Sequence, residues 1–293
     1  MNRSRRTRAI AGLTGLLALA AGAADAASGG RVGADIFAKP WVVYYADSAP
    51  VEAFGPYGVV VLDSDSHPPL EPLNAQGKVL LGYVSLGEVE EHRSWYATVK
   101  QWGILQKENP NWKGSYYVDP RDSRWSRLVV EELVPSILAK GFAGIFIDTL
   151  DNPIYLEEVD PQQNKGMSEA AAQLVQSIRR HFPSIPIMLN RAYQLLPKVE
   201  GDIDMELGEA VYARYDFDRK AYRRVDKADY EQQVRWLKDA MARQPGLRVM
   251  TLDYWNPSDA AGIRRIYAAE RANGFLPYVA TLKLNRIVKE PAP

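Results

Sequence analysis

Eight short apolar runs, rich in Val, Ile and Leu, recur along the 293-residue chain with looped or amphipathic helical segments between them. Near-continuous apolar runs of this length are typical of strands buried on both faces of a parallel sheet. The expected strands span residues 41–45, 58–62, 78–85, 144–147, 185–189, 204–208, 247–252 and 275–280. The expected helices span residues 124–140, 168–182, 228–243 and 258–273, the last with Ser258 as its N-cap. Eight strands with crossover helices predict a single (β/α)8 barrel of the TIM type, in the α/β class.

A doubly wound open sheet is the competing topology. That fold normally carries a glycine-rich phosphate-binding loop directly after its first strand. Here the first predicted strand runs into Asp-Ser-Ala-Pro at residues 47–50, and neither a G-x-G-x-x-G motif nor a P-loop occurs in the chain. The barrel is therefore the favoured fold.

Residues 1–26 have the parts of a secretory signal peptide. Four arginines between Arg3 and Arg8 precede an apolar stretch from Ile10 to about Ala24, and residues 24–26 read Ala-Asp-Ala, the small-x-small pattern of a cleavage site. We expect a cleaved leader over 1–26, a lead-in over 27–40 and one barrel domain over 41–293. No later segment reaches the length of a membrane span, so the mature protein is expected to be secreted or periplasmic and free of the membrane.

Composition excludes several classes of function. Lys and Arg together number 36, as do Asp and Glu, and a formal net charge of zero argues against general nucleic-acid binding. The chain has no cysteine, which excludes disulfides, thiolate zinc sites and cysteine nucleophiles. The 16 tyrosines and 7 tryptophans suit a surface that stacks against sugars, although packing accounts for many of them. We expect a monomer.

Polar side chains end nearly every predicted strand, where (β/α)8 barrels carry out their chemistry. Any one of them could cap the helix that follows, but capping does not require carboxylates at six of eight strand ends. We therefore expect an acidic cleft at this mouth of the barrel. Its residues, in strand order, are Asp47, Asp63, Glu88, Asp148 with Asp151, Asn190 with Arg191, Glu209, Asp253 with Tyr254, and Tyr278.

Paired carboxylates among aromatic residues are the best supported chemistry. The chain has only three histidines and no G-x-S-x-G motif, which disfavours a serine triad. The segment from Asp63 to His67 lacks a second histidine at usable spacing, so no metal site is predicted. Two carboxyl groups suffice for glycoside hydrolysis: one protonates the leaving oxygen while the other attacks the anomeric carbon or activates water.

Asp148 and Glu209 are the predicted catalytic pair, because each emerges at the exit of a buried strand. Asp151 and Glu206 are the substitutes, although Glu206 falls on the opposite face of its strand from Glu209. Whether the sugar's configuration is retained or inverted depends on a distance that the sequence does not give. The predicted substrate-binding residues are Tyr45, Asp63, Tyr83, Glu88, Asn190, Arg191, Glu206, Tyr212, Asp253, Tyr254 and Tyr278.

Several motifs together resemble glycoside hydrolase family 114 over about residues 41–281. They are GYVSLGE at 82–88, GIFIDTLDN at 144–152, Asn190-Arg191, EAVY at 209–212, LDY at 252–254 and PYVAT at 277–281. The resemblance implies a (β/α)8 barrel that cuts internal α-1,4 linkages of galactosamine-rich polysaccharide without a cofactor. It also implies that the pair is an Asp after strand four and a Glu after strand six, here Asp148 and Glu209.

Two other functions remain open at this point. The barrel could bind polysaccharide without cutting it, for example in the export or anchoring of an exopolysaccharide matrix. Such a protein would use aromatic residues at the mouth of the barrel and would need no catalytic pair. It could also be an α-glycosidase for a different amino sugar or a uronic acid. Because fold does not fix function, the geometry of the site has to decide between the classes.

Overall fold

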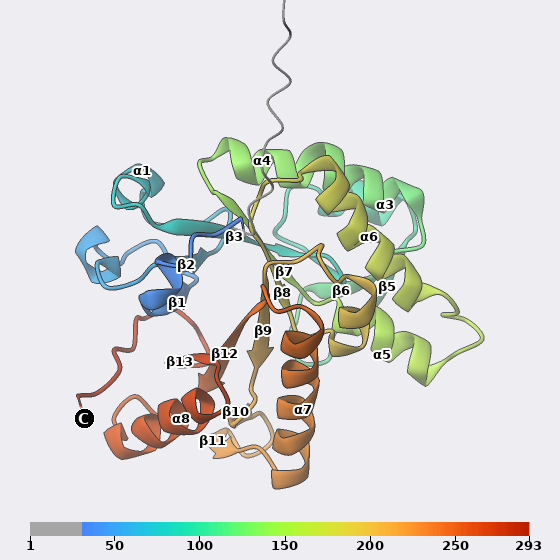
Figure 1. Ribbon diagram of the computed structural model, residues 1–293. Coiled ribbons are helices and arrows are strands. Elements are labelled where there is room, and N and C mark those ends of the chain that lie inside the picture. Colours follow the sequence, from blue (N-terminus) through green and yellow to red (C-terminus); the bar gives the residue numbers. More distant parts are fainter. Residues whose placement is uncertain (1–30, 293) are drawn as a thin grey trace, which may run out of the picture.

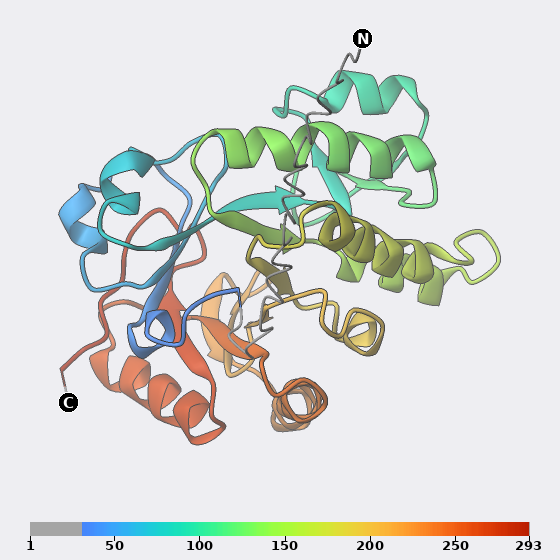
Figure 2. The same ribbon diagram turned by 45° about the horizontal axis from the view of Figure 1, so that its top comes forward.

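Eight parallel strands curve around one core in the computed structural model, which describes residues 31–292 (Figures 1 and 2). Each predicted strand is present, with ends that differ by no more than two residues. The sheet is nearly closed into a barrel with helices outside it, which confirms the predicted (β/α)8 fold. In sheet order the strands are β1 (Trp41–Tyr44), β2 (Val59–Leu62), β3 (Val79–Ser85), β7 (Gly144–Asp148), β8 (Ile187–Asn190), β9 (Met205–Glu209), β12 (Arg248–Tyr254) and β13 (Leu276–Ala280).

Side chains help to close the seam between β1 and β13, the two edge strands of this sheet. The Trp41 indole N–H donates to the Leu276 carbonyl at 2.8 Å, and the ring packs against Tyr278 at a centroid distance of 5.7 Å. Past the end of β1, the Tyr45 N–H donates to the Leu284 carbonyl at 2.7 Å. The seam is thus held by the Trp41 side chain and by the segment after β13, which contacts the end of β1.

The four predicted helices surround the sheet (Figure 2). The first is a continuous helical segment made of α3 (Ser123–Leu128), the π-helical turn η3 (Val129–Leu133) and α4 (Val134–Ala139). The others are α6 (Met167–His181), α7 (Lys227–Arg243) and α8 (Ala260–Ala272). Shorter elements are α1 (Leu70–Asn74), α2 (Tyr96–Gln101), α5 (Asp151–Val159) and the 3-10 turns η1 (Ile36–Ala38), η2 (Val51–Phe54) and η4 (Tyr193–Lys198).

The N-cap predicted for α8 is wrong by one residue. Asp259, not Ser258, caps this helix, and its Oδ1 accepts from the Gly262 N–H at 2.8 Å. Ser258 instead takes part in the preceding turn, where its N–H donates to Asn256 Oδ1. The predicted signal peptide lies outside the described residues. Within them, no helix is both long and apolar enough to cross a membrane.

Two small antiparallel sheets were not predicted, and both follow carboxyl ends of barrel strands (Figure 1). A three-stranded sheet of β4 (Glu88–Glu90), β5 (Leu105–Glu108) and β6 (Ser115–Val118) is inserted after β3. A hairpin of β10 (Ala213–Asp216) and β11 (Ala221–Arg224) is inserted after β9. Because both sheets follow the carboxyl ends of strands, they lie at the mouth of the barrel, where the polar strand ends converge.

Gly144 sets the spacing of β7 and β8 and provides a test of the barrel packing. A Cβ at this position would lie 2.0 Å from the Pro186 carbonyl oxygen, which is backbone and cannot move aside alone. We predict that Gly144→Ala lowers the free energy of unfolding by about 1–3 kcal/mol or more, as overpacking does. Gly246→Ala is the control, since nothing lies within 4 Å of its added Cβ. Equal urea midpoints for the two variants would contradict this.

Candidate active site

A cavity of about 1060 Å³ opens at the carboxyl ends of the strands. Side chains alternate along a strand, so Phe146 and Asp148 of β7, and Leu252 and Tyr254 of β12, line it together. The structure brings ten of the predicted site residues into the lining of this cavity. They are Tyr45, Asp63, Tyr83, Glu88, Asp148, Asp151, Asn190, Arg191, Glu209 and Tyr254.

Asn190 holds Asp148 and Glu209 side by side. Its amide nitrogen donates to Asp148 Oδ1 at 2.9 Å and to Glu209 Oε2 at 2.6 Å. Since both oxygens bind one nitrogen, they are no more than about 5.5 Å apart, so the two carboxyl groups lie next to each other in the cavity. The other oxygen of Glu209 accepts from the Tyr254 hydroxyl at 2.5 Å. Three neighbouring strands and β12 thus converge on one carboxylate pair.

Asp148 lies where its carboxyl group retains a proton near neutral pH. Burial, followed by the charge of Glu209, raises the pKa of Asp148 to about 7, while the hydrogen bond from Asn190 acts in the opposite direction. Burial and the charges of Asp148 and Glu209 also raise the pKa of Tyr45 well above its ordinary value, which keeps this wall of the cavity neutral. Burial and the nearby charge of Glu209 thus favour the protonated form of Asp148.

Backbone strain is concentrated directly after the strands that carry these groups. Thr149, Arg191, Ala192 and Ala210 all have a positive φ, between 48° and 68°, which residues with a Cβ adopt rarely. Thr149, a β-branched residue, is held there by its hydroxyl, which accepts from the Gly87 N–H at 2.8 Å and donates to the Asp148 carbonyl at 2.7 Å. Strain of this kind persists where the surroundings enforce it, often at functional sites.

Asp151 lies one turn beyond Asp148, at the start of α5. Its Oδ2 is 3.4 Å from Arg191 Nε, the residue that follows Asn190. Burial raises the pKa of Asp151, while the charge of Arg191 opposes the shift. The ion pair links the first turn of α5 to the end of β8. This places Asp151 beside the pair, engaged with an arginine.

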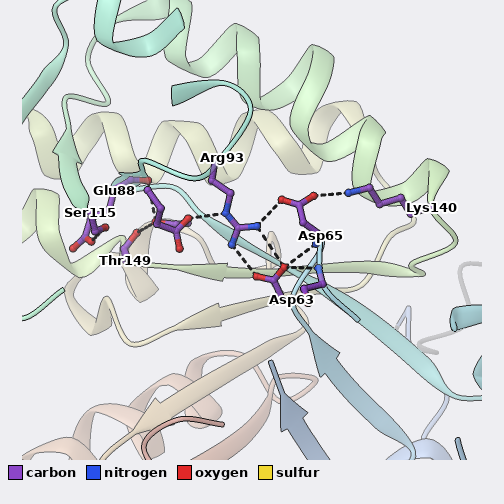
Figure 3. A network of polar contacts seen from close by, with 10 residues as sticks. Asp63, Asp65, Glu88, Arg93, Ser115, Lys140 and Thr149 are labelled. Atoms are coloured by element: carbon purple, nitrogen blue, oxygen red, sulfur yellow. Dashed lines mark hydrogen bonds and ion pairs between the residues drawn. The ribbon is translucent and has the colours of Figure 1, made fainter. Parts of the chain in front are cut away.

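Asp63 belongs to an ionic network around Arg93, a buried residue that sequence reasoning missed (Figure 3). Arg93 donates to Asp63 Oδ2 at 2.8 Å, to Asp65 Oδ2 at 2.7 Å and to Glu90 Oε2 at 2.8 Å. Burial works against ionisation, but the hydrogen bond and charge of Arg93 lower the pKa of Asp63. Arg93 also lies 5.7 Å from the centre of the Tyr83 ring. The network fixes the wall that carries Asp63 and Tyr83.

Glu88 is the anchor of the three-stranded sheet (Figure 3). Its carboxylate is 4% exposed and accepts from Asn109 Nδ2 at 2.6 Å, from Asn152 Nδ2 at 2.5 Å and from the Ser115 hydroxyl. Three donors satisfy the charge of a buried carboxylate. Glu88 therefore joins the inserted sheet to α5, next to Asp151.

Four predicted substrate-binding residues do not line the cavity: Glu206, Tyr212, Asp253 and Tyr278. Glu206 and Asp253 are fully buried and point outward, because they alternate with the inward-facing Glu209 and Tyr254. Asp253 Oδ1 accepts from the backbone N–H groups of Tyr212 and Ala213 at the root of the hairpin. Tyr212 packs against Tyr230.

Tyr278 is the fourth. Its ring is buried against Trp41 and Tyr57, and its hydroxyl accepts from the Val288 N–H at 3.1 Å. Tyr278 is therefore part of the packing near the seam rather than of the cavity. Asp47, which was expected at the same mouth, does not belong to the cavity lining either.

The cavity is acidic although the chain is neutral overall. Its lining has seven acidic residues against four lysines and arginines. Glu90, Glu91, Lys113 and Lys283 belong to this set and were not predicted, because they lie on the inserted sheet or after β13 rather than at strand ends. No group of three or more His, Asp or Glu within residues 31–292 is arranged to hold a metal ion.

A (β/α)8 barrel with a carboxylate pair at its strand ends is typical of glycoside hydrolases. The chain belongs to glycoside-hydrolase family GH114, whose sequence model matches residues 24–292, and this confirms the resemblance found in the motifs. It is 26% identical over 223 residues to an uncharacterised protein of Deinococcus radiodurans, a match that covers 73% of this chain and 68% of that one.

Two solved structures share the fold. The glycoside hydrolase domain of PelA from Pseudomonas aeruginosa superposes with a TM-score of 0.75 at 23% identity, over 86% of this chain and 98% of that domain. Ega3 of Aspergillus fumigatus, solved in complex with galactosamine, gives a TM-score of 0.63 at 16% identity, over 86% of this chain and 94% of that one.

The raised pKa of Asp148 predicts a pH-dependent gain in stability when its charge is removed. As pH rises from about 4 to 7, the unfolded chain loses this proton before the folded chain does, so the wild type becomes less stable. Asp148→Asn avoids that loss and should exceed the wild type by on the order of 4 kcal/mol at pH 8, with little difference near pH 4. Urea unfolding across this range measures it.

The exposed Asp218→Asn is the matched control and should show no such gain. Parallel stability curves for Asp148→Asn and the wild type between pH 4 and 8 would show that the native site does not favour a protonated Asp148.

Proposed function

We propose that this protein is an endo-acting hydrolase of α-1,4-linked galactosamine polymers, with Asp148 and Glu209 as the catalytic pair. The observation that carries the proposal is the shared amide of Asn190, which holds the two carboxyl groups side by side, and a close carboxyl pair is what double displacement uses. Membership of family GH114 and the similarity to Ega3, which was solved with galactosamine, support the choice of substrate.

The reaction proceeds in two steps with retention of configuration. In the first, the ionised carboxylate attacks the anomeric carbon and the protonated partner gives its proton to the glycosidic oxygen, so that the C–O bond breaks and a glycosyl–enzyme ester forms. In the second, the partner, now ionised, takes a proton from water, which attacks the anomeric carbon and releases the first carboxylate. The first step needs one ionised and one protonated carboxyl group, and burial favours a protonated Asp148.

The charge of the cavity fits a cationic chain. Seven acidic residues against four basic ones leave a local surplus of negative charge. Galactosamine units without an acetyl group carry an ammonium ion at neutral pH, which such a surplus attracts. The same surplus disfavours polymers of uronic acids, which are anionic.

A barrel that binds polysaccharide without cutting it is the second candidate. Carboxylates far outside the separations of hydrolases would have favoured it, whereas the pair here shares one hydrogen-bond donor. The geometry therefore supports an enzyme over a binding module.

Glu209→Gln tests the pair, and Glu206→Gln on the same strand is its matched control. Glu209 lines the cavity, whereas Glu206 points away from it. We predict that Glu209→Gln and Asp148→Asn each lower turnover of partly deacetylated galactosamine polymer by about a thousandfold or more, because each removes one half of the acid–base and nucleophile pair. Glu206→Gln should keep most of the activity, and mass spectrometry of the oligomers measures all three.

The stereochemistry of the first product tests the double displacement. Proton NMR during early digestion should show the new reducing end as the α anomer before mutarotation. A β anomer would contradict retention. Cleavage of another glycan alone would contradict the galactosamine substrate, and polymer binding without any cleavage would establish the non-catalytic barrel.

A further inference from the structure

Two exposed aromatic side chains meet at the mouth of the cavity, one from each inserted sheet. Trp112 lies in the turn between β5 and β6, and Phe217 directly follows β10. Their rings are 5.9 Å apart between centroids at an interplanar angle of 83°, an edge-to-face contact. Trp112 lines the same cavity as Asp148 and Glu209, yet it is 53% exposed. The contact therefore lies at the rim of the cleft.

The turn that carries Trp112 is fixed by hydrogen bonds. The Trp112 N–H donates to the Asn109 carbonyl at 3.2 Å, and the Ser115 N–H donates to the Trp112 carbonyl at 3.1 Å. The side chains of Asn109 and Ser115 both donate to the buried carboxylate of Glu88. Since Glu88 also binds Asn152 of α5, the position of Trp112 is tied to the segment that follows Asp148.

Phe217 is supported by a row of aromatic rings. It contacts Tyr215 edge-to-face at 5.3 Å, and Tyr215 contacts Tyr222 in the same manner at 5.3 Å. The Tyr222 hydroxyl accepts from the N–H of Leu282, which itself lines the cavity. The row thus runs from one wall of the cavity to Trp112. The tryptophan is held on one side by its own turn and on the other side by Phe217.

We propose that Trp112, supported by Phe217, binds a sugar unit of the polymer away from the cleaved bond; this rests on the proposed function. Large aromatic rings left exposed at a cavity rim are characteristic of binding surfaces. The apolar C–H face of a pyranose ring packs on the indole, and an ammonium group of galactosamine is attracted to the electron-rich ring face. A rim position gives Trp112 contact with a long chain but not with the unit at the carboxylates.

Substrate length separates this role from catalysis. We expect Trp112→Ala to raise KM for the polymer about tenfold with kcat nearly unchanged, the loss of one stacking and cation–π contact. Galactosamine trimers, the short substrate for comparison, should be cut by the variant as fast as by the wild type, because Trp112 is proposed to bind units away from the cleaved bond. Trp112→Phe should recover most of the polymer KM, and Phe217→Ala should show part of the defect.

Trp236→Ala is the matched control, because Trp236 is an exposed tryptophan that does not line the cavity. It should leave both KM values unchanged. An unchanged polymer KM in Trp112→Ala would overturn the proposal, and so would an equal loss on polymer and trimer.

A binding assay separates failure of this inference from failure of the proposed function. Calorimetry with partly deacetylated galactosamine polymer compares Glu209→Gln with the double variant Glu209→Gln/Trp112→Ala. A tenfold weaker Kd in the double variant supports the role of Trp112 even if the wild type cuts nothing. Equal Kd values would overturn it even if the wild type is an active hydrolase.

Discussion

The amide of Asn190 is the contact on which the site depends. Two carboxylates this close repel each other unless a proton or a donor lies between them, and the Asn190 nitrogen donates to both. The three residues come from β7, β8 and β9, which are neighbours in the sheet. Their meeting therefore requires that each strand present an inward-facing residue at its carboxyl end. A shift of one residue in any of the three would turn its polar group to the outside.

The strained residues show how this requirement is met. The chain must leave each strand sharply so that the end groups face the mouth, and Thr149, Arg191 and Ala210 take the left-handed backbone that permits such turns. Each conformation costs about 1–3 kcal/mol and needs compensation elsewhere. The apolar interior below, with Met188, Leu207 and other fully buried side chains, is where that compensation arises. The site thus combines backbone strain, partial burial and an acidic lining.

The amino-acid sequence is most informative about the barrel and the pair. Buried parallel strands are continuous apolar runs, so each strand is recognisable, and the alternation of side chains along a strand separates Glu209 from Glu206. The same alternation separates Asp253 from the inward-facing Tyr254, so nearness to a strand end alone is a poor guide to which side chain reaches the mouth. Tyr278 shows the same limit, because its ring fills the packing beside Trp41.

The features that the sequence did not predict are those that depend on contacts between residues distant in the chain. The strands β4 to β6, β10 and β11 are short and largely polar, so no apolar run identifies them. Arg93 is paired with Asp63, 30 residues away, and no local pattern relates the two. The anchor at Glu88 is visible in the sequence only as a polar strand end, since its partners Asn109, Ser115 and Asn152 come from three separate segments.

The proposed binding of polymer at the inserted sheets bears on the protonation of Asp148. Burial is the largest cause of the raised pKa of Asp148, so whatever covers the mouth strengthens that shift by removing more water. A bound polymer chain would cover the mouth in this way. Ammonium groups on the same chain would act in the opposite direction, because positive charge favours ionised carboxylates. In the proposed galactosamine substrate, acetylation would then tune the proton affinity of Asp148: acetylated units remove water without adding charge, and deacetylated units remove water and add positive charge.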